Sequence, residues 1–121
     1  MAHFAKISEE NIVLSVHAVD DGNAASEEKG AAFLERVHGW PEHLWIQTSY
    51  NTQGNQHKLG GTPFRFNMPE IGYTYDSLRD GFIPPKPGND YILIERKSQW
   101  SSMIDWTSQY REQVKLFRSD V

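Results

Sequence analysis

The chain has 121 residues, with 12 Lys and Arg against 16 Asp and Glu, and hence a net charge of −4. This acidic balance, without a basic run, argues against binding to nucleic acid through phosphate contacts. The absence of cysteine excludes disulfides, thiol catalysis and thiolate metal sites. The length predicts one domain over residues 1–121, and no apolar run is long enough to predict a membrane span or a secretion signal.

The N-terminal part predicts a β-hairpin. Residues 4–7 and residues 12–19 are strand candidates on either side of a short polar connection. Alternation in the second strand predicts a sheet with one apolar face and one mixed face. The predicted apolar face consists of Ile12, Leu14, Val16 and Ala18.

A helix, a strand and a long loop are expected next. Residues 26–38 form the helix, because Ser26 is a good N-cap and Gly39 provides a stop. Residues 44–50 are rich in aromatic and β-branched residues and predict a strand. Residues 51–69 are dominated by Gly, Asn, Gln, Thr and Pro, with a short strand candidate at 64–66. A loop of this length is typical of a binding or docking surface.

Residues 71–87 predict a second hairpin that ends in a proline arm. Two tyrosines alternate on one strand, residues 76–81 supply turn chemistry, and the prolines remove ladder donors from the return strand. Residues 84–88 form a stiff Pro-rich connector. From this segment we predict interface residues at Tyr73, Tyr75, Phe82, Ile83, Pro84 and Pro85.

The C-terminal part predicts a strand over residues 91–95 and a helix over residues 102–118. Ser102 with Asp105 resembles a capping box, and Met103, Trp106, Tyr110, Val114 and Phe117 recur at helical spacing. Trp106 and Tyr110 complete the predicted interface set. The expected fold is α+β, a small antiparallel sheet covered on one face by the helices at 26–38 and 102–118.

The search for chemistry predicts no catalytic, cofactor-binding or metal site, and thus no enzyme. Only His38 and His43 of the five histidines are close in sequence, and Gly39 and Pro41 between them interrupt the helix that a metal pair needs. The acids fall in turns or at a helix start, where capping and solvation explain them. Phosphate-binding glycine loops, nucleophile elbows and calcium loops are absent from the sequence.

Five ordered blocks carry a resemblance to a known family. They cover residues 1–7, 11–13, 45–52, 54–61 and 71–87, the last being Ile71-Gly72-Tyr73-Thr74-Tyr75-Asp76 followed by Arg79-Asp80 and Phe82-Ile83-Pro84-Pro85-Lys86-Pro87. In this order they resemble small virion-associated structural proteins of tailed phages, especially marine cyanophages. After residue 87 the chain departs from that family, which would continue into an extended Trp- and Pro-rich tail. The helix expected at 102–118 is similar instead to the end of tail-fibre assembly chaperones.

The resemblance implies a non-catalytic virion component, either a capsid decoration or cement protein or a small tail or baseplate part. A tail-fibre assembly chaperone, or another phage accessory binding protein, is the alternative. A small carbohydrate-binding module or enzyme using the aromatic hairpin is a third hypothesis. The expected partners are other virion proteins, in several copies per particle, with no nucleic acid, membrane or cofactor. The expected location is the virion, after assembly in the host cytoplasm.

Overall fold

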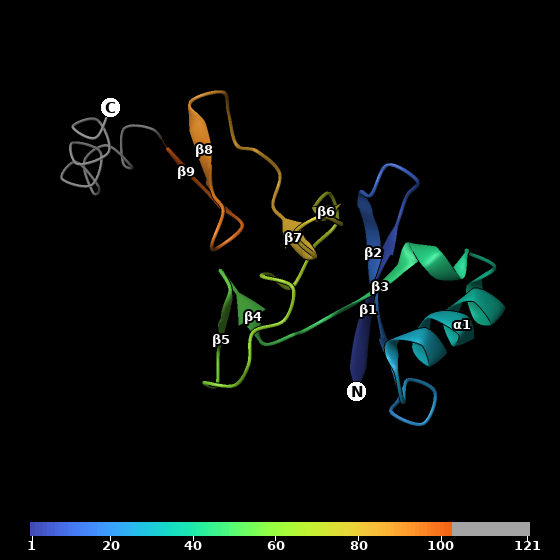
Figure 1. Ribbon diagram of the computed structural model, residues 1–121. Coiled ribbons are helices and arrows are strands. Elements are labelled where there is room, and N and C mark those ends of the chain that lie inside the picture. Colours follow the sequence, from blue (N-terminus) through green and yellow to red (C-terminus); the bar gives the residue numbers. More distant parts are fainter. Residues whose placement is uncertain (103–121) are drawn as a thin grey trace.

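The computed structural model of the protein describes residues 1–102 (Figure 1). Within this range the strands pair only antiparallel, and they form a three-stranded sheet and three separate two-stranded sheets. The elements in chain order are β1 (Ala2–Ile7), β2 (Val13–Val19), α1 (Glu27–His38), η1 (Glu42–Leu44), β3 (Trp45–Thr48), β4 (Thr52–Gln53), β5 (Gln56–His57), β6 (Thr74–Asp76), β7 (Gly81–Ile83), β8 (Tyr91–Ile94) and β9 (Gln99–Ser102).

The three-stranded sheet has the order β2-β1-β3, and α1 packs on one of its faces. The predicted caps of α1 are confirmed: the Ser26 side chain accepts a hydrogen bond from the Lys29 N–H at 3.1 Å, and Gly39 adopts a left-handed φ of 68°. Helix and sheet approach closely at Gly30, where an added Cβ would lie 2.3 Å from the ring of Phe4. The buried cluster of this interface contains Phe4, Val19, Ala31, Leu34 and Trp45.

A β-hairpin covers the opposite face of the sheet. Phe82 of β7 is fully buried there, in a second cluster with Ala5, Ile7, Val13 and Leu44. The backbone reinforces this contact, because the Val13 N–H donates to the Tyr73 carbonyl at 2.8 Å and the Gly72 N–H donates to the Val13 carbonyl at 2.9 Å. The central sheet therefore lies between α1 and the β6–β7 hairpin.

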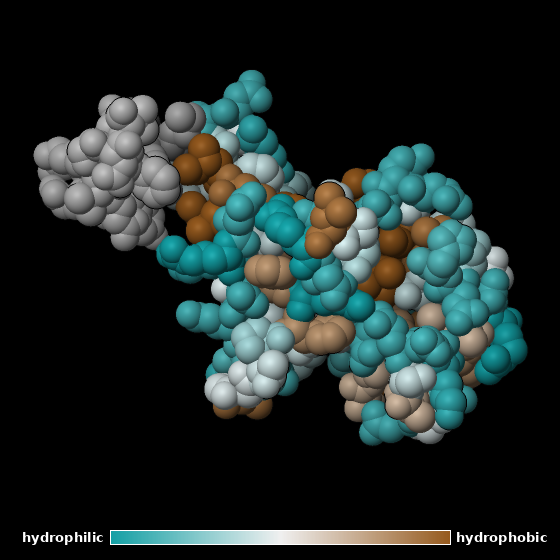
Figure 2. Space-filling view, in the orientation of Figure 1, coloured by the Kyte–Doolittle hydropathy of each residue, from teal (hydrophilic) through white to brown (hydrophobic). Residues whose placement is uncertain are grey.

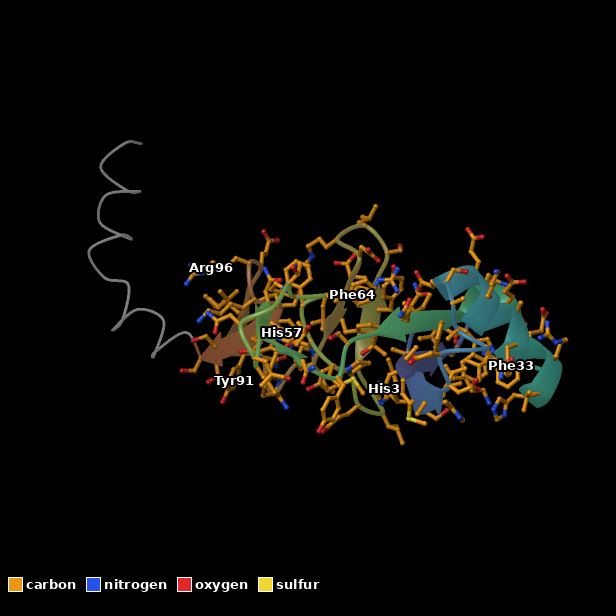
Figure 3. All side chains as sticks on the ribbon, turned by 90° about the horizontal axis from the view of Figure 1, so that it is seen from below. His3, Phe33, His57, Phe64, Tyr91 and Arg96 are labelled. Carbon is orange, nitrogen blue, oxygen red and sulfur yellow. The ribbon has the colours of Figure 1, made fainter. Side chains whose placement is uncertain are left out.

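The remaining hairpins extend the molecule away from α1. Figures 1 and 3 show the same order in two views: α1 at one end, then the central sheet, then the hairpins, with β8–β9 farthest from α1. Trp100 of β9 reaches back and donates its indole N–H to the Pro84 carbonyl at 2.6 Å. The chain is thus a row of small antiparallel units rather than one sheet.

The prediction of one sheet covered by two helices is wrong. In the described residues α1 is the single α-helix, and the strands divide among four sheets. Ser102, the expected cap of the second helix, is the last residue of β9 and pairs with Tyr91. The rest of the predicted helix, with Trp106 and Tyr110, lies outside the described residues. Phe82 covers the other face of the sheet, for which the prediction offered no cover.

Three local predictions also need correction. The expected apolar face of β2 is not its buried set: Val13 and Val19 are buried, whereas Leu14 is 39% exposed, because the β1–β2 register shifts at this point. Residues 64–66 are not a strand, since two of them have positive φ. Residues 51–69, predicted as one long loop, contain the β4–β5 hairpin. The strand predicted over residues 91–95 is observed as β8, which belongs to a two-stranded ribbon with β9.

Candidate functional site

An open groove of about 610 Å³ lies between α1, η1 and β3. Its apolar floor includes Trp45, and its rim carries carboxylates from two elements. The lining residues that bear charge or titrate are Glu27, Glu28, Glu35, Glu42, His43 and Arg65. Four carboxylates against one guanidinium give the groove an acidic character.

Arg65 organises one wall of this groove. Its Nε donates to Asp80 Oδ1 at 2.9 Å, and its Nη2 donates to Glu27 Oε1 at 3.0 Å. Its Nη1 donates to Glu27 Oε2 at 2.5 Å and to the Gln47 carbonyl at 2.7 Å. Glu27 Oε2 also accepts the Gln47 N–H at 2.8 Å. The ion pair therefore occupies the outer edge of β3, where it satisfies backbone groups that a neighbouring strand would otherwise bind.

Arg65 stays charged and Tyr75 stays protonated at neutral pH. Burial disfavours the charged form of Arg65, but hydrogen bonding to Glu27 and the nearby carboxylates outweigh it, so the pKa of Arg65 is raised. The Tyr75 hydroxyl donates to Asp80 Oδ1 at 2.5 Å. Burial, followed by this hydrogen bond, raises the pKa of Tyr75 to about 12. Tyr75 is therefore no base at neutral pH, and every nitrogen of the Arg65 guanidinium already has a partner.

The Arg65 network is a polar joint, because its hydrogen bonds connect α1, β3 and the β6–β7 turn. A second polar joint, formed by Asn67, lies two residues further along the chain. Asn67 is fully buried, and its Oδ1 accepts the Gly54 N–H at 2.8 Å. Its Nδ2 donates to the Phe82 carbonyl at 2.8 Å and to the Ser98 carbonyl at 3.0 Å. Gln99 adds a longer bond to Oδ1, at 3.3 Å. One side chain thus ties the β4–β5 turn, strand β7 and the β8–β9 turn together.

The predicted interface residues of the aromatic hairpin lie at several depths. Phe82 is fully buried, and the centre of the Tyr75 ring lies 5.4 Å from the centre of its ring, with the two planes tilted by 51°. Tyr73 packs half-buried against the same cluster. These three residues attach the hairpin to the central sheet. Ile83 is half-buried at the end of β7.

The proline arm is held against β9. The Pro84 carbonyl accepts the Trp100 indole N–H, and the Lys86 ammonium lies 5.5 Å from the centre of a Trp100 ring. Pro84 is half-buried and Pro85 is exposed. Whether any of the predicted set contacts a partner stays a prediction, and Trp106 and Tyr110 lie outside the described residues.

Sequence reasoning missed both polar joints. Arg65 and Asn67 fall within residues 64–68, a short aromatic and apolar stretch in a Gly- and Pro-rich region. Arg65 and Phe66 adopt φ values of 53° and 69°, which turn the chain sharply between the two joints. The available signal was one cation and one amide inside that apolar stretch, which is too weak to predict their partners.

The described residues contain no three His, Asp or Glu side chains gathered closely enough to hold a metal ion. In the same range, no helix combines the length and apolar character needed to cross a membrane. No protein-family model, curated protein or solved structure matches the chain. What the site does must therefore follow from its own geometry.

Proposed function

We propose that the protein is a non-catalytic structural component of a tailed-phage virion, a capsid decoration protein or a small tail or baseplate part. It acts by contacting neighbouring virion proteins. The observation that supports this most is the β8–β9 ribbon, in which Tyr91, Ile92, Leu93 and Ile94 place apolar side chains on both faces and none is fully buried. Figure 2 shows apolar residues over this ribbon. Two-stranded ribbons are marginal in water, so a neighbour that covers these side chains would stabilise it.

The described chemical groups favour contact over catalysis. Ser15 Oγ and His17 Nε2 lie 2.8 Å apart, which brings a serine hydroxyl to a histidine base. However, the other contacts of the His17 ring are to His38 and Trp45, at 4.8 and 5.2 Å between ring centres, rather than to a carboxylate that would orient it. This pair also lies outside the residues that line the acidic groove.

The aromatic hairpin offers little support for sugar binding. A carbohydrate platform needs an aromatic face that is free to stack. The Tyr75 ring has Phe82 at 5.4 Å and the Arg65 guanidinium at 5.9 Å, and its hydroxyl is bound to Asp80. These contacts make Tyr75 part of the packing of the hairpin, which is consistent with a structural role.

Mass spectrometry of purified virions tests the proposal. The chain should occur in the particle at a fixed ratio to the major capsid or tail protein, and Ile92→Ser should lower that ratio several-fold. Val37→Ser is the matched control, because Val37 is 58% exposed on α1, at the other end of the molecule. Absence from purified particles, with the folded protein present in the lysate, would contradict the proposal and favour the accessory-protein alternative.

A further inference from the structure

The two edge strands of the central sheet differ in how their outward-facing backbone groups are hydrogen-bonded. The edge of β3 is filled at Gln47, whose N–H and carbonyl bind Glu27 and Arg65. The edge of β2 is paired only at its start, where Val13 binds Tyr73 and Gly72. Beyond that point no hydrogen bond from another described element reaches the backbone of β2.

The alternation of antiparallel bonding identifies the free backbone groups of β2. The N–H and carbonyl of Gln47 point away from β1, so Gln47 and its partner Phe4 form a non-hydrogen-bonded pair. Phe4 therefore directs its own N–H and carbonyl toward β2, where it lies opposite His17. His17 is therefore bonded to β1, and its neighbours Val16 and Ala18 direct their backbone groups outward. Before Ser15 the register shifts by one residue, so odd-numbered instead of even-numbered residues direct their backbone groups outward there. This explains why the N–H and carbonyl of Val13 also point away from β1.

The open part of β2 lacks the usual protection of an edge strand. Natural edges are blunted by charges, prolines or covering segments. Strand β2 has the sequence VLSVHAV, with no Lys, Arg, Asp, Glu or Pro. Ala18 is exposed and Val16 is half-buried. The opposite edge is closed at Gln47 by the part-buried ion pair of Arg65 and Glu27, so of the two edges this one is open to another strand.

We infer that β2 pairs antiparallel with β2 of a second copy of this chain, about a two-fold axis at His17. Val16 then lies opposite Ala18 of the second copy, and each pair exchanges two backbone hydrogen bonds, four in all. With the two-fold axis at His17, both Val16 and Ala18 form backbone hydrogen bonds with the second copy. With the axis at Val16 or at Ala18, only one of these two residues would pair with an outward-facing residue of this set. The two central sheets join into one six-stranded sheet. This inference does not depend on the virion proposal.

A disulfide probe tests the register. In this pairing His17 faces itself in a non-hydrogen-bonded pair, whose Cα atoms lie about 4.5 Å apart, within the span of a disulfide. The natural chain has no cysteine, so His17→Cys can cross-link only to another copy. Mild oxidation should convert most of this variant to a covalent dimer. Leu78→Cys is the control, since Leu78 is 97% exposed in the β6–β7 turn and should cross-link at least ten-fold more slowly. Equal rates for both variants would overturn the inference.

Sedimentation equilibrium of the full chain tests the association itself. The natural chain should approach the mass of a dimer at high concentration and dissociate on dilution. Ala18→Pro removes two of the four bonds while leaving the β1–β2 ladder intact, because the Ala18 N–H faces outward; the dissociation constant should rise at least about ten-fold. Ala18→Ser keeps the N–H and serves as the control. A natural chain that stays monomeric, or a folded Ala18→Pro variant that dimerises normally, would overturn the inference.

If Ala18→Pro fails to fold, amide exchange of the natural chain decides. The N–H groups of Val16 and Ala18 should be protected at high concentration and exchange at least ten-fold faster on dilution. The His17 N–H, bonded to β1, should stay protected at both concentrations. Exchange of Val16 and Ala18 that does not depend on concentration would show that this edge stays unpaired.

Discussion

Replacing Asn67 with alanine should destabilise the protein more than most single substitutions. The side chain has no exposed surface and satisfies the Gly54 N–H and the carbonyls of Phe82 and Ser98. Alanine leaves all three backbone groups without this partner. Each buried polar group left unsatisfied costs about 1–3 kcal/mol, so the expected loss in free energy of unfolding is roughly 3–5 kcal/mol after partial relaxation.

Urea denaturation followed by tryptophan fluorescence and circular dichroism measures this loss. A domain of this size has a total stability of about 6–18 kcal/mol, so the change removes a large part of it. With a slope of about 1–3 kcal/mol per molar urea, the midpoint should fall by at least about 1 M. Asn67→Asp should also be strongly destabilising, because a carboxylate would face the Phe82 and Ser98 carbonyls where the amide donates.

Asn89→Ala is the matched control for these variants. Asn89 is exposed in the turn before β8, and its replacement should change the free energy of unfolding by no more than about 0.5 kcal/mol. A loss below about 1 kcal/mol for Asn67→Ala would refute the idea that this amide joins the hairpins, because at least one of the three backbone groups must stay buried when they remain assembled.

Three further outcomes follow from the geometry. Arg65→Lys should lower the free energy of unfolding by about 1–3 kcal/mol in urea denaturation, since an ammonium cannot reproduce the guanidinium fork, whereas exposed Arg36→Lys should be near neutral. Burial, then nearby His38 and Lys6, lower the pKa of His17 below 6.5, so its stabilising contribution is complete above that pH and is lost as pH falls through the folded-state value. The urea midpoint should therefore drop between pH 7.5 and pH 5, less steeply in His17→Asn than in exposed His43→Asn. Gly30→Ala should lower the thermal midpoint despite a helix-propensity gain of about 1 kcal/mol, because its Cβ would overlap a buried ring.

Local signals in the sequence predicted local structure well. Helix α1 was predicted from Ser26 and Gly39, and both residues cap it in the structure. The N-terminal hairpin and the hairpin around Tyr75 were likewise predicted from alternation and turn residues. Such signals report on neighbours in the chain, which is why they hold without knowledge of the tertiary contacts.

The errors arose where distant residues decide the structure. Phe64, Arg65 and Phe66 alternate like a strand, but two residues in left-handed conformation turn the segment so that Arg65 reaches Glu27, 38 positions away. Leu14 follows the apolar pattern of β2, but the register shift removes it from the core. Neither the partner of a loop arginine nor the position of a bulge is encoded in a periodicity, so the candidate site was not predictable from pattern alone.

Hydrophobic burial and hydrogen bonds contribute in different proportions to the two halves of the described chain. Of the ten buried hydrophobic residues, all but Phe82 lie at or before Trp45, in the central sheet, α1 and η1. The hairpins beyond Thr48 are joined instead by the hydrogen bonds of Arg65 and Asn67, two residues apart in one sharp turn. Hydrophobic burial therefore dominates in the first half, whereas the second half combines Phe82 and a few backbone hydrogen bonds with these two side chains and keeps the apolar residues of β8 half-buried. The apolar side chains of β8 thus lie outside the two hydrophobic clusters around the central sheet, which leaves them available for the contact proposed above.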